Sequence, residues 1–335
     1  MENKTVIDAV ILWVDGNDPK WIEERKKYQA DKSQDAGNSR YRDWGMLKYL
    51  FRSICKYAPW IRTVHLVTCG QKPEWLEMEC KKLHFVKHSD FMPKQYLPTF
   101  SSRAIDLNLH RIEGLAEHFI YFNDDMLLTN YVKPDDFFRK GLPCDMFSER
   151  PICYSGNVFA HNLLNTMEVL ARIYDRKHVL KENRKKILNI RYGKVFFYNL
   201  IWYFMPFKKF CGLYICHLPL SYRKSTWEKI WKMAPEEMEK TIANRFRTIT
   251  DLNQFIFVFD ALLSGQFYPT NMDKQGKYFN VIDENNDEMY KAIKENKYKR
   301  ICINDNCSQE IFEKTKDKVI ECLEIILPEK CIFER

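Results

Sequence analysis

Residues 6–14 read VIDAVILWV, and the segment DGNDP follows at 15–19. A run of apolar and β-branched residues that stops at an acidic, glycine-containing turn is typical of a buried strand leading into a loop. The run HFIYF at 118–122 has the same form and ends in the triplet NDD at 123–125. Both runs therefore predict buried strands whose carboxyl ends carry acidic and amide side chains.

Helical and extended patterns alternate between these two runs. WGMLKYLFRSICKYA at 44–58 has apolar residues at helical spacing, RTVHLVTC at 62–69 and LHFVK at 83–87 read as strands, and a helix is expected through RAIDLNLHRI at 103–112. This alternation predicts an α/β fold with a largely parallel sheet. Because ligands of such sheets bind beyond the carboxyl ends of the strands, the two acidic loops are expected to share one site.

The net charge is +8, from 53 basic and 45 acidic residues. A positive chain suits anionic partners such as nucleotide diphosphates, anionic lipid surfaces or nucleic acid. No dense basic run with interleaved aromatic residues supports nucleic acid in particular, so no nucleic-acid partner is expected.

The cysteines and the N-terminus indicate a compartment. The 11 cysteines are odd in number and include no CxxC pair, which argues against a disulfide framework and favours free thiols in a reducing environment. The start, MENKTVIDAVILWVDG, lacks the features of a signal peptide. No apolar stretch reaches the roughly 18 residues needed to span a bilayer. A cytoplasmic protein is expected.

Three segments differ in character. Residues 1–150 hold the alternating pattern of an α/β core. Residues 151–216 form a helical insertion rich in aromatic and basic side chains, and residues 217–335 return to a helical pattern with one short strand. The last helix is expected at 309–326, with Ser308 as its cap.

The apolar centre of the insertion, 195–207, allows two interpretations. A buried helix is the favoured one. The alternative is a surface that rests on a bilayer, with its basic flanks toward the lipid headgroups.

The triplet Asn123-Asp124-Asp125 is the first candidate for chemistry. Adjacent carboxylates at a strand end need a positive partner, and a divalent ion bound by oxygen ligands and substrate phosphates would supply it. The alternative is a solvated turn. The loop Asp15-Gly16-Asn17-Asp18 has the same character, and Asn304-Asp305-Asn306 is a third acidic-amide loop.

Basic residues after position 216 are the second group of candidates. His217 has a pKa range suited to general base catalysis on an acceptor hydroxyl, although a lone histidine is more often a hydrogen-bonded structural residue. Arg245 and Arg247 could clamp phosphate, because a planar guanidinium matches two oxygens. The alternative is ordinary charge on a helix surface.

Taken in order, four blocks resemble the Stealth family. The family includes bacterial capsule polymerases that transfer hexose-1-phosphate, and the catalytic subunit of the animal enzyme that places N-acetylglucosamine-1-phosphate on lysosomal glycoproteins. The blocks are DAVILWVDGNDP at 8–19, the stretch from YRDWGMLKYL to FIYFNDDMLL within 41–128, HLPLSYRKSTWEKI with NRFRTITDLNQFIFVFDALLSG within 217–265, and KRICINDN at 299–306.

The resemblance implies a mostly parallel, Rossmann-like or GT-A-like sheet flanked by helices, with a helical second half. Residues 1–150 would bind a nucleotide-sugar, and 217–335 would complete the same active site. The implied reaction moves hexose-1-phosphate, with N-acetylhexosamine-1-phosphate favoured, from a UDP-sugar to a hydroxyl of a glycan acceptor. A phosphodiester forms and UMP leaves, in the synthesis of capsule or another cell-surface polysaccharide.

The resemblance also implies roles for individual residues. Asp125, with Asp124 or Asp305, would hold Mg²⁺ or Mn²⁺ on the diphosphate. His217 would be the general base, with Asp15 as the second choice. Arg247 would stabilise the transferred phosphoryl group. The residues expected to bind substrate are Asn17, Asp18, Arg52, Arg103, Asn123, Arg245 and Asn304.

Two other functions remain open at this stage. A metal-dependent glycosyltransferase that forms a glycosidic bond would use the same acidic loops, and a non-catalytic lectin-like or membrane-surface binding protein is a rival from another class. The resemblance to bacterial members favours a location at the inner face of the membrane. The aromatic and basic stretch at 195–210 would then contact that membrane or the export machinery.

Overall fold

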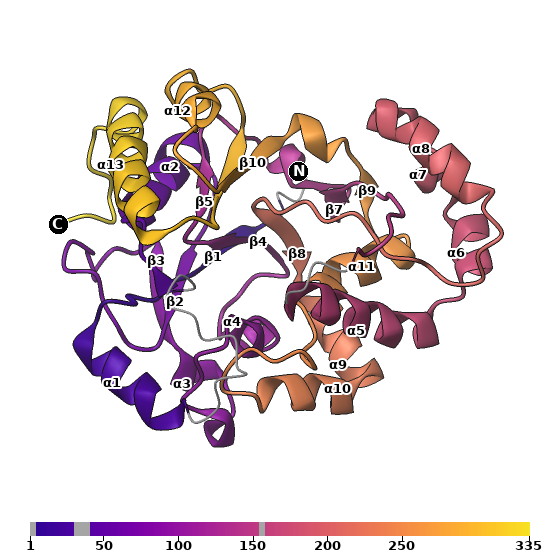
Figure 1. Cartoon of the computed structure of the whole chain (residues 1–335), viewed down its shortest axis with the longest axis horizontal. Coiled ribbons are helices and arrows are strands. Elements are labelled where there is room, and N and C mark those ends of the chain that lie inside the picture. Colours follow the sequence, from indigo (N-terminus) through magenta and orange to yellow (C-terminus); the bar gives the residue numbers. More distant parts are fainter. Residues whose placement is uncertain (1–4, 30–40, 154–157) are drawn as a thin grey trace.

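The computed structural model describes residues 5–29, 41–153 and 158–335. At its centre lies a five-stranded sheet in the order β3-β2-β1-β4-β8 (Figure 1). The strands are β1 (Ile7–Leu12), β2 (Val64–Thr68), β3 (Leu83–Lys87), β4 (His118–Asn123) and β8 (Leu220–Arg223). The first four are parallel to their neighbours, whereas β8 runs antiparallel to β4.

Helices flank this sheet, which confirms the predicted α/β fold with a parallel-dominated sheet. In Figure 1, α2 and α13 lie above the central strands, and α4, α9 and α10 lie below them. On the α9 side, the Trp227 ring packs 5.3 Å from Phe119 of β4, measured between centroids. The helices are α1 (Pro19–Tyr28), α2 (Leu47–Tyr57), α3 (His88–Phe91), α4 (Ser102–Asp106), α5 (Val158–Ile173), α6 (Arg176–Glu182), α7 (Arg184–Ile187), α8 (Lys194–Tyr203), α9 (Lys224–Met233), α10 (Pro235–Ile242), α11 (Phe255–Leu263), α12 (Asp287–Lys294) and α13 (Gln309–Ile326).

Two small sheets extend the central one. The first has the order β10-β11-β5, and the second the order β6-β7-β9. Strand β5 starts only three residues after β4 ends, so the NDD turn joins the central sheet to the first small sheet. The strands are β5 (Met126–Leu128), β6 (Phe138–Arg139), β7 (Leu142–Asp145), β9 (Tyr268–Pro269), β10 (Gly276–Val281) and β11 (Arg300–Asp305).

The second half therefore contains more extended structure than its helical pattern predicts. Strand β8 is only four residues long and joins the far edge of the central sheet. One contiguous hydrophobic core runs from Ile7 to Phe333 and includes residues of all three predicted segments. The boundaries at 150 and 216 stay a prediction. The predicted cap of the last helix is present, because the Ser308 side chain accepts a hydrogen bond from the Ile311 amide.

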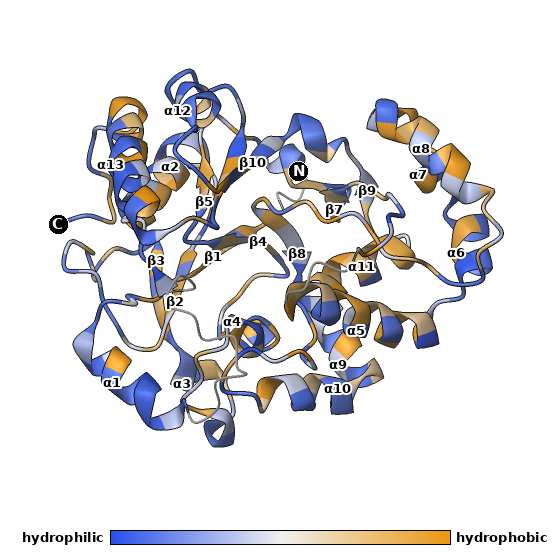
Figure 2. Cartoon of the chain, viewed as in Figure 1, coloured by the Kyte–Doolittle hydropathy of each residue, from blue (hydrophilic) through white to orange (hydrophobic). Residues whose placement is uncertain are grey.

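The favoured prediction that residues 195–207 form a buried helix is wrong. Helix α8 buries only Val195 and Asn199. Phe197 and Ile201 are exposed and the other apolar side chains of α8 are half-buried; Figure 2 shows α8 as a hydrophobic helix at the edge of the molecule. Apolar composition favours burial in general, but this helix has no packing partner on that face among the described residues. No helix in the part of the chain that the structure describes is long and apolar enough to cross a membrane.

Asp8 is the polar exception inside β1, a strand whose six residues are all buried. Its carboxylate accepts hydrogen bonds from Arg62 Nε at 2.8 Å, from His65 Nε2 at 3.1 Å and from the Ala116 amide at 2.8 Å. Burial opposes the charged form, but these bonds outweigh it and lower the pKa of Asp8. The interactions fasten β1 to β2 and to the loop before β4.

We expect Asp8→Ala to lower the free energy of unfolding by about 3 kcal/mol at pH 7, because it removes a fully buried carboxylate and leaves the buried His65 Nε2 without this hydrogen-bond partner. A lowered folded-state pKa means that this stabilisation is complete above the unfolded-state value of about 3.9 and is lost as the pH falls through the lower folded-state value. Urea unfolding at several pH values measures the difference. Asp317→Ala, at an exposed position, is the control; equal effects of the two variants would contradict the assignment.

Candidate active site

A cavity of about 780 Å³ opens beyond the carboxyl ends of β1 and β4. Trp13 and Val14 line it from the end of β1, and the NDD triplet lines it from the end of β4. The location agrees with the rule for parallel sheets. The predicted site residues that line this cavity are Arg103, Asn123, Asp124, Asp125, His217, Arg247, Asn304 and Asp305.

Asp124 and Asp125 concentrate negative charge at the cavity wall. Burial raises the pKa of Asp124 well above its usual value, and Asp125 and Asp43 add to the rise. Burial also raises the pKa of Asp125, although the charge of His217 opposes that effect. Among the described residues, no lysine or arginine forms an ion pair with either carboxylate. Asp125 Oδ1 is buried and has no hydrogen-bond partner. A bound cation would supply the missing positive charge and would give Asp125 Oδ1 a partner.

Asp125, His217 and Cys302 form a compact group. One ligand atom of each lies within 4.8 Å of the others. The Cys302 thiol donates to Asp125 Oδ2 at 3.4 Å, and burial raises the pKa of this thiol well above its usual value. Tyr278 and Phe255 hold the His217 ring in edge-on contacts, with centroid distances of 5.6 and 6.3 Å. Sequence analysis missed Cys302, because its place in an apolar strand gives no local signal.

Asp305 has a positive partner that the sequence did not indicate. Arg42 Nη2 donates to Asp305 Oδ1 at 2.7 Å, and the two side chains are each 11% exposed. Arg42 also donates to the Cys307 carbonyl. Asp305 Oδ2 is buried without a partner. Only this second oxygen of Asp305 is therefore available for the predicted metal binding.

A hydrogen-bonded chain leads from the protein interior to the triplet. The Tyr121 hydroxyl lies 2.8 Å from Asp106 Oδ1 and 2.6 Å from Asn123 Oδ1. Burial raises the pKa of Asp106 to about 7, although Tyr121, Arg247 and Arg103 oppose the rise. One phenol hydrogen cannot serve two oxygens. A protonated Asp106 resolves this conflict, because it donates to Tyr121 while Tyr121 donates to Asn123.

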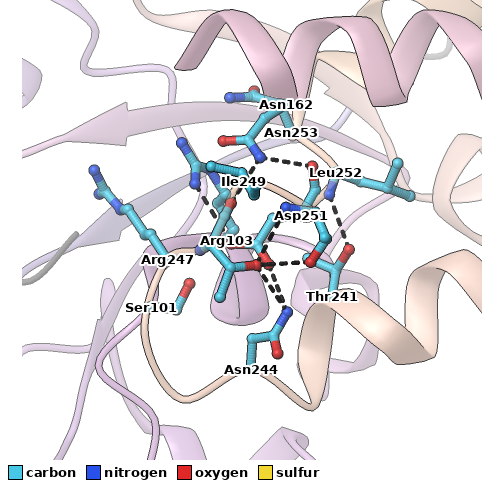
Figure 3. Close-up of polar contacts among 12 residues, drawn as sticks. Ser101, Arg103, Asn162, Thr241, Asn244, Arg247, Ile249, Asp251, Leu252 and Asn253 are labelled. Carbon is cyan, nitrogen blue, oxygen red and sulfur yellow. Dashed lines mark hydrogen bonds and ion pairs between the residues drawn. The ribbon is translucent and has the colours of Figure 1, made fainter. Parts of the chain in front are cut away.

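Arg247 reaches the cavity from the loop between α10 and α11. The buried Asp251 carboxylate organises this loop, and it accepts from Asn244 Nδ2 at 2.7 Å and from the Thr248 amide at 2.8 Å. Figure 3 shows the Arg247 side chain extending away from this network. Arg247 Nη2 donates to Ser102 Oγ at 2.7 Å. The predicted phosphate clamp thus lies in a braced loop and not on a helix surface.

Arg103 joins this network from α4. Its Nη1 lies 3.4 Å from Asp251 Oδ2, and both side chains are buried. Asn162 of α5 donates to the carbonyls of Thr248 and Asp251, which attaches the loop to a third element. Arg103 is therefore a cavity-lining cation whose charge is partly neutralised.

Two predicted arginines lie outside the cavity lining, and the structure does not support their assignment to substrate. Arg52 donates to both carboxylate oxygens of Glu334, at 2.8 and 2.9 Å, and to the Leu327 carbonyl. Arg245 donates to the Pro98 carbonyl and lies over the Tyr28 ring. Both guanidinium groups hold distant segments together. Contacts like these, between residues far apart in the chain, cannot be recognised from the sequence.

The loop Asp15-Gly16-Asn17-Asp18 directly follows Val14, which lines the cavity, but none of its own residues line it. Asp15 Oδ1 accepts from the Asn17 amide, and Asp18 caps α1 by accepting from the Lys20 amide. Gln71 binds both ends of the loop, because its side-chain nitrogen donates to the Asp15 carbonyl and to Asp18 Oδ2. These contacts favour a structural role for Asp15, Asn17 and Asp18 in the described structure.

Family models for two regions match this chain: "Stealth protein CR1, conserved region 1" over residues 5–33 and "Stealth protein CR2, conserved region 2" over residues 40–144. The capsular polysaccharide phosphotransferase WcwK of Streptococcus pneumoniae is 36% identical over 338 residues and is matched over 100% of both chains. The exopolysaccharide phosphotransferase cps2G of Lactiplantibacillus plantarum is 37% identical, with 98% of this chain and 96% of that protein covered.

The receptor polysaccharide phosphotransferase WefC of Streptococcus oralis is 36% identical, over 98% of this chain and 99% of its own. Among solved structures, the apo-form glycosyltransferase GlyE of Streptococcus pneumoniae aligns over 94% of this chain and 84% of its own. The identity is 10% and the TM-score 0.26, so this likeness carries no argument about the fold or the reaction.

We expect Asp251→Asn to lower the free energy of unfolding by about 3 kcal/mol, because it leaves Arg103 without its buried counter-charge. Urea denaturation followed by tryptophan fluorescence measures this change. Asp135→Asn, which alters an exposed carboxylate, should stay within about 0.5 kcal/mol of the wild type. A wild-type midpoint for Asp251→Asn would show that the network does not brace the loop.

Proposed function

The chain belongs to the Stealth family of polysaccharide phosphotransferases, and on this basis we propose that it transfers a sugar with its attached phosphate from a UDP-sugar to a glycan hydroxyl. The enzyme class, a phosphotransferase of capsular or exopolysaccharide synthesis, follows from the full-length relatives. The donor, the release of UMP and a preference for N-acetylhexosamine-1-phosphate are the proposed details. The observation that carries the proposal is the cavity in which two unneutralised carboxylates, His217 and Arg247 meet.

Asp124 and Asp125 are proposed to hold Mg²⁺ or Mn²⁺, with the free oxygen of Asp305 as a third candidate ligand. The orphaned Asp125 Oδ1 and Asp305 Oδ2 support this, since each is a buried anionic oxygen without a partner. Carboxylate oxygens suit these hard cations. When bound, the ion would neutralise the diphosphate and stabilise the departing nucleotide.

His217 is proposed as the general base, which accepts the acceptor hydroxyl's proton at a ring nitrogen. The ring lies beside Asp125, with one ligand atom of each residue within 4.8 Å of the other, which places it at the cation site. Asp15 was the second candidate. Its place outside the cavity lining makes it the weaker one.

Arg247 is proposed to stabilise the negative charge that spreads over the transferred phosphoryl group. Its guanidinium lines the cavity and donates to the uncharged Ser102 hydroxyl, and no carboxylate among the described residues forms an ion pair with it. Arg103 contributes less, because Asp251 offsets its charge. Phosphoryl transfer depends on positioning and charge neutralisation more than on covalent help from the protein, and this cavity offers both.

A metal-dependent glycosyltransferase would use much of the same machinery, so the products separate the two reactions. We expect incubation with a panel of UDP-sugars, a divalent ion and a glycan acceptor to release UMP in proportion to new phosphodiester. Release of UDP with a glycosidic product would replace the proposal by that alternative. Metal-dependent UDP-sugar binding without any product would favour a binding protein.

Removing the proposed cation site should abolish turnover. We expect Asp125→Asn to lower kcat by about 10³-fold or more, and EDTA to inactivate the wild type until Mg²⁺ or Mn²⁺ is restored. Calorimetric titration with Mn²⁺ should show binding to the wild type and weak binding to the variant. Asp135→Asn is the matched control. Full activity in EDTA would rule out a metal-dependent reaction.

Replacing the proposed base should change both the rate and its pH dependence. We expect His217→Ala to lower kcat by about 10²–10⁴-fold and to alter the pH profile of kcat, because the variant lacks the group that accepts the proton. A pH profile of both enzymes measures this. Asp15→Asn serves as the comparison. If His217→Ala keeps its rate while Asp15→Asn loses it, Asp15 is the base.

A further inference from the structure

Helix α8 exposes two large apolar residues and buries a polar one. Phe197 is 67% exposed and Ile201, one turn further along, is 60% exposed. Phe204 and Ile190 extend the same surface at 74% and 83%. Asn199, in contrast, is buried, and its side-chain nitrogen donates to the carbonyls of Phe147 and Ile187. We call the surface of residues 190–209 the α8 surface.

The polar contacts that hold the α8 surface lie beneath it. Arg176 is 3% exposed and pairs with Glu149, which is 2% exposed, at 2.9 Å. The same guanidinium donates to the carbonyls of Trp202, Met205 and Phe207, which follow one another at the end of α8. A buried ion pair thus holds the backbone of this segment from inside, while Phe204 and Phe207 stay exposed. The exposure is built into the fold.

Charge on the α8 surface has one sign. The stretch from Asn183 to Trp227 contains no aspartate or glutamate, but has nine lysines and arginines. Glu182, at the end of α6, is the nearest acidic residue before it along the chain. Four of these cations belong to the α8 surface, and all four are exposed: Arg191, Lys194, Lys208 and Lys209.

We propose that the α8 surface docks the protein on an anionic lipid bilayer. Exposed aromatic and aliphatic side chains rimmed by lysine and arginine are the pattern of a segment that lies in the membrane interface. Ten residues of helix rise only about 15 Å, so α8 lies along a bilayer and does not cross it. In Figures 1 and 2, the α8 ribbon lies at the outer edge of the molecule, away from the central sheet.

Charge complementarity selects a lipid surface as the occupant. A second copy of this chain would bring the same cations face to face across a two-fold interface, which charge repulsion opposes. Anionic headgroups attract each such cation, and the apolar side chains then enter the acyl boundary. The inference goes beyond the proposed function, because membrane docking requires neither a donor sugar nor turnover.

Vesicle flotation of the full chain tests the proposal. We expect binding to phosphatidylcholine vesicles that contain phosphatidylglycerol, and little binding to phosphatidylcholine alone. Binding should weaken when salt shortens the screening length from about 10 Å at 0.1 M to about 3 Å at 1 M. The double variant F197S/I201S should lower the partition coefficient about tenfold or more. I282S/I325S, at isoleucines that are 58% and 61% exposed elsewhere, should leave it unchanged.

A second pair of double variants tests the contribution of the lysine charges. K194Q/K208Q should weaken binding to anionic vesicles about tenfold or more, whereas K26Q/K232Q, at exposed lysines of α1 and α9, should not. Circular dichroism and turnover on a soluble acceptor should match the wild type for all four variants, which separates docking from folding and catalysis. Failure to bind anionic vesicles at 0.1 M salt, or equal effects of test and control variants, would overturn the proposal. So would self-association through the α8 surface, measured by sedimentation.

Discussion

Burial of two adjacent carboxylates at the junction of β4 and β5 is the constraint on which the site depends. The turn that carries them leaves the central sheet and enters a second sheet, and the Ile303 amide of β11 donates to the Asp125 carbonyl at 2.9 Å. The backbone is therefore held on both sides, which keeps the two half-buried carboxylates at the cavity wall. Burial in this position also raises the pKa of both carboxyl groups. A cation, the imidazole of His217 and the guanidinium of Arg247 are the groups that can balance this charge in the cavity.

Much of the architecture is predictable because its signals are local. The apolar runs that become β1, β2 and β4 end in turn-forming residues, and the alternation with helices sets the parallel sheet. The position of the NDD triplet at the cavity follows from that sheet. The helical pattern after residue 217 concealed β8, because a four-residue edge strand has too few residues to show a period of two.

Long-range contacts account for what the sequence did not reveal. Arg52 and Arg42 look alike as isolated arginines, but one pairs with Glu334 and the other with Asp305 at the cavity. Cys302 and the Asp251 network also depend on partners far along the chain. Hydrophobic composition is an equally limited guide in the α8 segment. Its composition favours burial, and only the packing of the folded chain shows that its surface is exposed.

The pairing of β5 with β11 sets an order of assembly. Residues 126–128 pair with 300–302, so the wall of the cavity next to the triplet is completed by a strand that is synthesised much later than the triplet itself. Contacts between such distant residues form late, because a long loop must close before they stabilise the fold. During translation the acidic turn precedes its covering strand by some 170 residues of chain. Until β11 has been synthesised, a growing chain therefore carries a β5 edge that lacks its pairing partner.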